Sequence, residues 1–208
     1  MFKKILVLAP HTDDGELGMG GSIAKFIEEG KEVFVAAFSI AEDSVPKGFE
    51  KDSLVFEFRE AMKVLGVKPE NQIIFKNQVR HFPANRQIIL EQILSLRNDI
   101  NPDLVFVPSP NDIHQDHQVI ASEGLRVFKK ISLLGYELPW NNIVFETRSF
   151  IKLNEIHIKK KIEALHCYKT QKHRSYLDEN FIRGLAKTRG TQFEYNYAEA
   201  FEVLRLIF

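Results

Sequence analysis

KKILVLAPHTDD, residues 3–14, is an apolar run that ends directly in a cluster of polar side chains. A continuous apolar run of this length is typical of a parallel strand that is buried on both faces. The polar cluster then lies at the carboxyl end of the strand, where open α/β sheets bind their ligands. Residues 21–29 follow with apolar side chains at helical spacing, with Ser22 as candidate N-cap and Gly30 as the end of the helix. The stretch therefore predicts a strand–helix unit with a functional edge.

The same alternation continues along the chain. Predicted strands cover 31–40, 72–76, 103–108 and 143–148, and predicted helices cover 52–65, 85–98, 117–131 and 155–168. Residues 197–208 form a helix or a strand, which their pattern does not separate. Strands that alternate with helices of this length predict an α/β fold with a mainly parallel sheet flanked by helices. A length of 208 residues suits one such domain over 1–208.

The composition narrows the choice of partners. The 28 Lys and Arg residues balance 28 Asp and Glu residues, so no net charge attracts a nucleic acid. The longest apolar run near the N-terminus, 5–10, is much shorter than a signal-peptide core or a membrane span, which favours a cytoplasmic protein with no membrane partner. Cys167 is the sole cysteine, so histidines and carboxylates would have to bind any metal. The 17 phenylalanines suit a packed core, and some are candidates for a homo-oligomer interface.

Two polar clusters, 11–14 and 110–117, each follow a predicted strand. Adjacent carboxylates beside an imidazole repel each other unless a positive group is near, and a divalent cation is one such group. Because parallel strands end at the same edge of a sheet, His11, Asp14 and one of His114 or His117 can converge. Two histidines and one carboxylate with an open position suit catalytic zinc, Fe²⁺ or another divalent ion. The alternative is that these side chains only cap the helices that follow.

The motifs Pro10-His11-Thr12-Asp13-Asp14 and His114-Gln115-Asp116-His117 resemble those of the PIG-L/LmbE family of metal-dependent N-deacetylases. The resemblance extends through Arg59-Glu60-Ala61 and 161–171 to 197–201, and so spans nearly the whole chain. It implies a Rossmann-like three-layer α/β fold. It also implies a hydrolase that removes an acyl group, usually acetyl, from the amine of a small N-acetylglucosamine-type sugar.

The resemblance further implies roles for individual residues. The family's metal ligands correspond to His11, Asp14 and His117, its general base to Asp13, and a catalytic histidine to His114. The metal would be Zn²⁺, or Fe²⁺ or another divalent ion, which makes a bound water acidic enough for Asp13 to take its proton. A protonated His114 would stabilise the resulting oxyanion, and Asp116 is expected to keep His114 protonated and oriented.

Two arginines are candidate substrate-binding residues. Arg59 matches a family position that contacts substrate, and Arg148 is a second candidate of the same kind, although each could equally form a surface ion pair with a neighbouring glutamate. Asp112 stands where some sugar deacetylases of the family have a tyrosine, so no tyrosine is expected at that point of the site. The loops 42–51 and 79–85 are expected to shape the substrate pocket.

Two other functions compete with deacetylation. Gly18, Gly20 and Gly21 open a helix after the first strand, as in a nucleotide-binding or redox module, but their spacing departs from G-x-G-x-x-G. The carboxylates of Asp13 and Asp14 would also repel a pyrophosphate there. A metal-dependent phosphoesterase is the third possibility, because clusters of Asp and His also suit two-metal sites.

Overall fold

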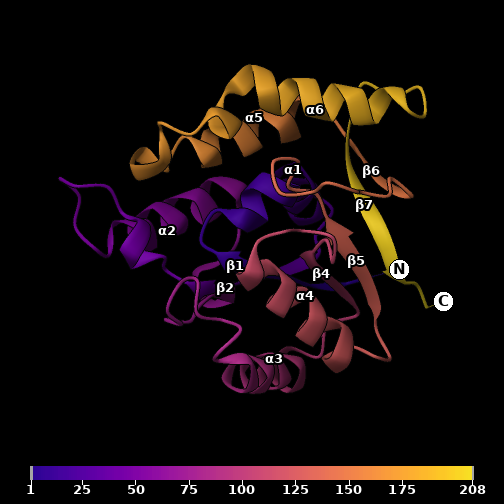
Figure 1. Ribbon diagram of the computed structural model, residues 1–208. Coiled ribbons are helices and arrows are strands. Elements are labelled where there is room, and N and C mark those ends of the chain that lie inside the picture. The colour runs from indigo at the N-terminus through magenta and orange to yellow at the C-terminus, as the bar shows by residue number, and fades with distance from the viewer. Residues whose placement is uncertain (1, 208) are drawn as a thin grey trace.

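The computed structural model describes residues 2–207 and contains a seven-stranded sheet in the order β3-β2-β1-β4-β5-β7-β6 (Figure 1). The strands are β1 (Lys4–His11), β2 (Glu32–Ser39), β3 (Gln72–Ile74), β4 (Leu104–Pro108), β5 (Ser132–Tyr136), β6 (Ser149–Leu153) and β7 (Tyr197–Arg205). The helices are α1 (Asp14–Glu28), α2 (Ser53–Leu65), α3 (Arg86–Ile100), α4 (Gln115–Val127), α5 (Glu155–Leu165) and α6 (Glu179–Thr191), with short 3₁₀ helices η1 (Glu42–Ser44), η2 (Pro69–Asn71), η3 (Lys169–Gln171) and η4 (Ser175–Leu177). Strands β1 to β5 are parallel, and β7 runs antiparallel to both β5 and β6. The sheet confirms the predicted α/β fold.

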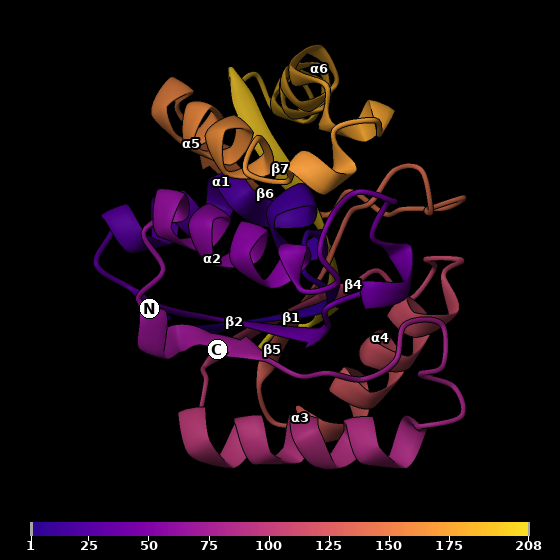
Figure 2. The ribbon, with the colours of Figure 1, turned by 90° about the vertical axis from the view of Figure 1, so that its left-hand side faces the viewer.

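Helices cover both faces of the sheet and make three layers. Figure 2 shows α1, α2 and α5 on one face and α3 and α4 on the other, and each group packs within itself. Successive side chains of β1 alternate between the two faces, so Val7 joins the core beneath α1, and Leu6 and Leu8 join the core beneath α3 and α4. Both faces of the central strands are therefore buried, as their unbroken apolar runs predicted.

The topology brings the two polar clusters together. Strand β1 pairs in parallel with β4, with Val7 opposite Phe106, so the two strands end at the same edge. The last residue of β1 is His11, and the loop after β4 leads to His114, the N-cap of α4. The tertiary pairing of two strands about a hundred residues apart thus places both motifs at one site.

Helix α1 begins at Asp14, seven residues before the predicted start. It is kinked at Met19, whose backbone is not helical (φ −150°, ψ 27°), and the residues predicted as a helix form its second half. The amides of Gly21 and Ser22 donate to the carboxylate of Glu199 at 3.1 and 2.7 Å. Ser22 is not an N-cap, because it lies inside α1, whose N-cap residue is Asp13.

The C-terminal half departs most from the sequence predictions. Residues 143–148 were predicted as a strand but are irregular, and Ile143 is 82% exposed. The strand β6 starts after them. The side chain of Glu202 on β7 accepts the amide of Glu146 (3.2 Å), and the amide of Arg148 donates to the carbonyls of Glu146 (3.0 Å) and of Phe201 on β7 (3.3 Å). The predicted helix over 117–131 ends earlier, and β5 and α6 were not predicted at all. The tail forms β7.

Candidate metal centre

Three donor atoms converge at the carboxyl edge of the sheet. The Nδ1 atom of His11 lies 3.0 Å from Oδ2 of Asp14 and 3.3 Å from Nε2 of His117. The distance between Oδ2 of Asp14 and Nε2 of His117 is 3.2 Å. His11 ends β1, Asp14 opens α1 and His117 lies in the first turn of α4. All three side chains are buried. They form a triangle of donors at the junction of three elements.

The triangle has the size that a tetrahedral ion requires. Metal–ligand bonds of about 2.0–2.1 Å at tetrahedral angles put neighbouring donors about 3.3–3.4 Å apart, which follows from the geometry of zinc sites. The edges of 3.0, 3.2 and 3.3 Å between His11, Asp14 and His117 are close to that value. Two imidazoles and one carboxylate also match the ligands of catalytic zinc and of non-haem iron. The residues present therefore fit a divalent cation.

A carboxylate holds the outer nitrogen of each imidazole. Nε2 of His11 lies 3.1 Å from Oδ2 of Asp116, and Nδ1 of His117 lies 2.7 Å from Oδ2 of Asp112. Both carboxylates are buried, and Asp116 also accepts the backbone amide of Arg80 at 2.6 Å. Such contacts set the tautomer and the orientation of a ligand imidazole. The part of Asp112 in this arrangement was not predicted; its position two residues before a motif histidine was the only signal.

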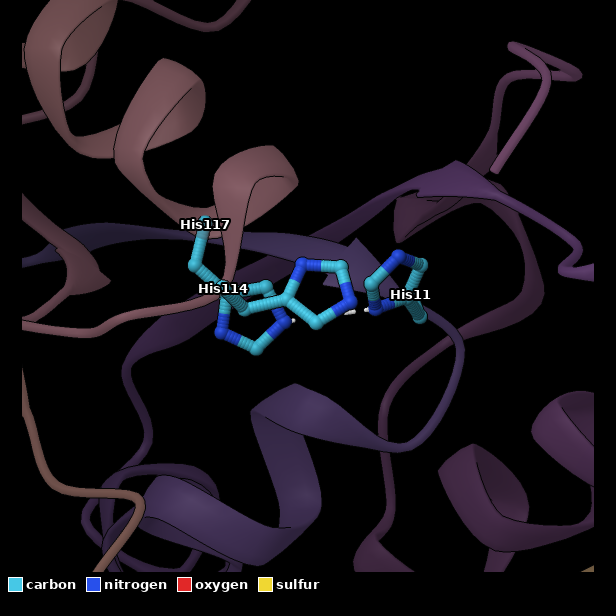
Figure 3. A group of neighbouring side chains, drawn as sticks. All are labelled: His11, His114 and His117. Carbon is cyan, nitrogen blue, oxygen red and sulfur yellow. Dashed lines mark hydrogen bonds between the residues drawn. The ribbon is translucent and has the colours of Figure 1, made fainter. Parts of the chain in front are cut away.

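His114 stands beside the triangle and faces the pocket. Figure 3 shows its ring next to those of His11 and His117, and the ring centroids are 5.0 and 4.5 Å away. Its Nδ1 accepts the backbone amide of Asp116 at 3.2 Å, so in the neutral ring the proton is on Nε2. Burial and the charges of the other two imidazoles lower the pKa of His114 to about 4.

The predicted pairing of His114 with the carboxylate of Asp116 is thus wrong. That carboxylate is turned toward His11 and toward the amides of Arg80 and Phe82. Only the backbone of Asp116 contacts the ring of His114, and it does so as a donor. A ring nitrogen that accepts a hydrogen bond carries no proton, so His114 is neutral here.

Asp13 lies next to the triangle without joining it. It is the N-cap residue of α1, yet its side chain makes no capping hydrogen bond, and it lines the same pocket as His114. Burial, followed by the neighbouring charge of Asp14, raises the pKa of Asp13 to about 6. This carboxyl group is consequently ionised at neutral pH and more basic than an ordinary aspartate.

In the absence of a metal, the imidazoles of His11 and His117 are protonated at neutral pH. Burial lowers the pKa of each ligand imidazole, but the carboxylate of Asp14 outweighs it and, with Asp116 for His11 and Asp112 for His117, raises the two values to about 9 and about 10. The same imidazolium charges hold the pKa of Asp14 far below its usual range despite its burial. The site therefore attracts positive charge strongly.

A buried glutamic acid supports the loop between the ligands. The hydroxyl of Tyr168 lies 2.6 Å from the carbonyl oxygen of Thr12 and 2.5 Å from Oε1 of Glu16. The hydroxyl has one proton, so when it donates to Thr12 the carboxyl of Glu16 must donate to it. Burial raises the pKa of Glu16 well above its usual range, which agrees with a neutral acid. The contact ties the loop to the end of α5.

The pocket that contains the triangle is lined by residues from distant parts of the chain. Besides the triangle, its lining includes Asp13, Arg80, His114, Trp140, Arg174 and Tyr176. The rings of Trp140 and Tyr176 are stacked at 4.1 Å and form an aromatic wall. Ser44 and Val79 also line it, so both loops expected to shape the pocket contribute.

The two arginines predicted from the sequence lie elsewhere. Arg59 is on the exposed surface of α2, and Arg148 is exposed and pairs with Glu146 at 2.8 Å. Neither is among the described residues that line the pocket, where Arg80 and Arg174 stand instead. No sequence signal marked the latter two, because they come from loops without a motif.

The fold and the cluster define an α/β protein with two histidines and an aspartate converging at the carboxyl edge of its sheet. Residues 6–128, more than half of the chain, match the family described as PIG-L: GlcNAc-PI de-N-acetylase, and the chain belongs to that family. This confirms the resemblance seen in the motifs.

Relatives and solved structures agree with this membership. The chain is 27% identical over 172 residues to the uncharacterized deacetylase YaiS of Escherichia coli. The matched residues cover 81% of this chain and 91% of YaiS. It is 23% identical to the diacetylchitobiose deacetylase of Thermococcus kodakarensis, over 99% of this chain and 85% of that protein. The conserved protein TT1542 of Thermus thermophilus shares the fold with a TM-score of 0.80 at 22% identity, over 100% of this chain and 97% of that one.

Among the described residues, no helix is long and apolar enough to cross a membrane.

Proposed function

We propose that this protein hydrolyses the N-acetyl, or another N-acyl, amide of an amino sugar or of its glycoside or nucleotide conjugate, with Zn²⁺, Fe²⁺ or another divalent cation as cofactor. The observation that carries the proposal is the donor triangle of His11, Asp14 and His117, with the free carboxylate of Asp13 beside it. The deacetylases among its relatives support the amide as the bond that is cleaved.

The proposed reaction divides the work among neighbouring residues. A divalent cation held by His11, Asp14 and His117 would supply Lewis acidity toward the amide carbonyl and would lower the pKa of a water molecule, so that the water loses a proton readily as it attacks. Asp13 accepts the proton of the attacking water, for which a pKa of about 6 suits work near neutral pH. The protonated Asp13 then returns that proton to the departing amine.

His114 acts on the carbonyl oxygen. Its Nδ1 accepts a backbone amide, which leaves the Nε2 proton to be donated toward the pocket. A donor placed there stabilises the negative charge that develops on the oxygen of the tetrahedral intermediate. The imidazole works as a neutral donor in this scheme, instead of the protonated one expected from the sequence.

The test compares Asp13→Asn with Asp14→Asn and with Asp99→Asn, an exposed aspartate on α3 outside the pocket, as control. Acetate release from N-acetylglucosamine and diacetylchitobiose is measured alongside the metal content of each variant by mass spectrometry. We expect Asp13→Asn to lose at least about 100-fold in turnover while keeping its metal, since general-base catalysis typically contributes that much. Asp14→Asn should lose both metal and activity, and the control neither.

Two results would contradict the proposal. Near-normal turnover by Asp13→Asn would reject Asp13 as the base. A metal-loaded wild-type protein that releases no acetate from any acetamido sugar, but cleaves a phosphodiester in a manner that survives Asp13→Asn, would favour the phosphoesterase alternative.

A further inference from the structure

Two guanidinium groups stand in the candidate substrate pocket. Arg80 and Arg174 line it together with His11, His114 and His117. The guanidinium of Arg80 donates to the hydroxyl of Ser44 at 3.0 Å, and neither arginine forms an ion pair with a carboxylate of the described residues. Both therefore have donors to offer to a ligand.

The backbone of Arg80 is built into the metal centre. Its φ of 68° is in the left-handed region, which costs free energy for a residue other than glycine. The amide of Arg80 donates at 2.6 Å to Oδ2 of Asp116, the same oxygen that lies 3.1 Å from Nε2 of His11. The strained backbone is thus held by the carboxylate that orients a candidate ligand, and this anchors the arginine at a set distance from the triangle.

Other basic side chains lie near Arg174, outside the pocket. This residue also lines a neighbouring cleft, whose other basic side chains are His166, Lys169, Lys172 and His173. Residues 166–177 contain no Asp or Glu, which is notable in a chain whose charges balance overall. The pocket and the cleft therefore share one basic border.

The acidic groups of that cleft are already engaged. Asp178 accepts the amides of Asn180 and Phe181 as the N-cap of α6, and Glu179 pairs with Arg183 at 2.7 Å. In the part of the chain that the structure describes, no carboxylate forms an ion pair with Lys169, Lys172 or Arg174. The positive charge of the border is left for a ligand to neutralise.

Three carboxylates in or beside the triangle contact its imidazoles and not the guanidinium groups of the two arginines: Asp14 contacts His11 and His117, Asp116 contacts His11, and Asp112 contacts His117. We propose that the substrate carries an anionic group, a phosphate or a carboxylate, on the part of the molecule remote from the acetamide, and that Arg80 and Arg174 bind it. This inference rests on the proposed function and narrows its substrate class. Guanidinium forks suit both anions, because each offers paired oxygens.

The experiment compares a neutral sugar with anionic ones on the metal-loaded protein. Acetate release is measured with N-acetylglucosamine, with its 6-phosphate, and with N-acetylglucosaminuronic acid, which carries a carboxylate at carbon 6; both anionic groups are remote from the acetamide at carbon 2. We expect at least one anionic sugar to exceed N-acetylglucosamine by about tenfold or more in kcat/KM, which is the effect of one charge-assisted hydrogen bond. The sugar that wins distinguishes phosphate from carboxylate.

Variants assign the effect to the two arginines. Arg80→Gln and Arg174→Gln should each reduce the preference for the anionic sugar, which is the ratio of its kcat/KM to that of N-acetylglucosamine, by about tenfold, mainly through the KM of the anionic sugar. Arg97→Gln, on α3 at the other face of the sheet and outside both the pocket and the cleft, is the matched control and should keep the preference. Thermal unfolding of each variant checks that the loops still fold. Equal kcat/KM for neutral and anionic sugars, or a preference that survives in the double variant, would overturn the inference.

A binding measurement separates this inference from the proposed function. Calorimetric titration of metal-loaded Asp13→Asn protein with the same sugars requires no turnover. If no sugar releases acetate, the proposed function fails, yet tighter binding of an anionic sugar that is lost in the double arginine variant still supports the anion site. If the anionic sugar binds equally tightly to the Asp13→Asn protein and to the same protein with both arginines replaced, the anion site is rejected.

Discussion

Asp112 and Asp116 show how much of the site depends on residues that would not touch a metal. Each carboxylate is buried and binds the outer nitrogen of one candidate ligand imidazole, at 2.7 Å for His117 and 3.1 Å for His11. The contact keeps the other nitrogen directed into the donor triangle. The residue that stands in place of a family tyrosine thus orients the imidazole of His117.

We therefore predict that Asp112→Ala weakens metal binding by about 10- to 100-fold, the range found for partners of ligand histidines. Asp112→Asn should lose less, because an amide oxygen can still accept the proton on Nδ1 of His117. Competition with a chromogenic chelator measures the affinity, and Asp103→Ala, which removes a carboxylate at the other end of the sheet, serves as the control. An unchanged affinity in Asp112→Ala would show that the contact is dispensable.

Helix α1 illustrates how a buried ion pair replaces a local cap. Its kink at Met19 interrupts the helical hydrogen bonds. Glu199 on β7 accepts two of the freed amides, and Lys161 on α5 donates at 2.7 Å both to the carbonyl of Leu17 and to Glu199. Three elements are joined at this point, directly behind the segment that carries Asp13 and Asp14.

Glu199→Ala should consequently destabilise the fold by about 3–5 kcal/mol, because it leaves the ammonium of Lys161 buried without its partner. Equilibrium unfolding in urea measures the loss. Glu163→Ala, an exposed glutamate on α5, should change the free energy of unfolding by less than about 0.5 kcal/mol. If both variants were equally stable, the ion pair would have no part in holding the kink.

Protons and a divalent cation compete for the same donors, and this links the stability of the protein to pH. Without metal, the pKa values of His11 and His117 are raised to about 9 and about 10, from 6.5. Groups with raised pKa values stabilise the folded state fully below pH 6.5, and the stabilisation is lost as the pH rises through 9 to 10. A bound cation requires both imidazoles to be neutral.

We predict that metal binding at pH 7 releases close to two protons, and that the number falls as the pH approaches 10. Calorimetric titration with Zn²⁺ in buffers of different ionisation enthalpy measures the protons released. The melting temperature of the metal-free protein should also fall between pH 7 and pH 10, by about 3 °C or more if 1 kcal/mol is lost. Zinc binding without proton release at pH 7 would contradict the raised pKa values.

Local pattern was sufficient for the central strands β1, β2 and β4 and for His11 and Asp14, whereas the choice of His117 over His114 came from the resemblance to the family. The apolar runs of β1, β2 and β4 are buried on both faces, so their hydrophobicity alone identifies them as central strands. The polar residues that interrupt those runs, among them His11 and Asp14, stand where the strands end. Their location at strand ends follows from the sequence, because it depends only on where the chain leaves a buried layer; the pairing of β1 with β4 then brings the two motifs together.

The tertiary structure alone decided which partners these residues have. Asp116 binds His11, 105 residues away, and the pocket takes its arginines from the loop of Arg80 and from the loop after α5. In the irregular run 143–148, the side chain of Glu202 and not a backbone carbonyl accepts the amide of Glu146. In each case a side chain satisfies a distant polar group, and the energy of burying that group without a partner depends on the packed molecule and not on the local sequence.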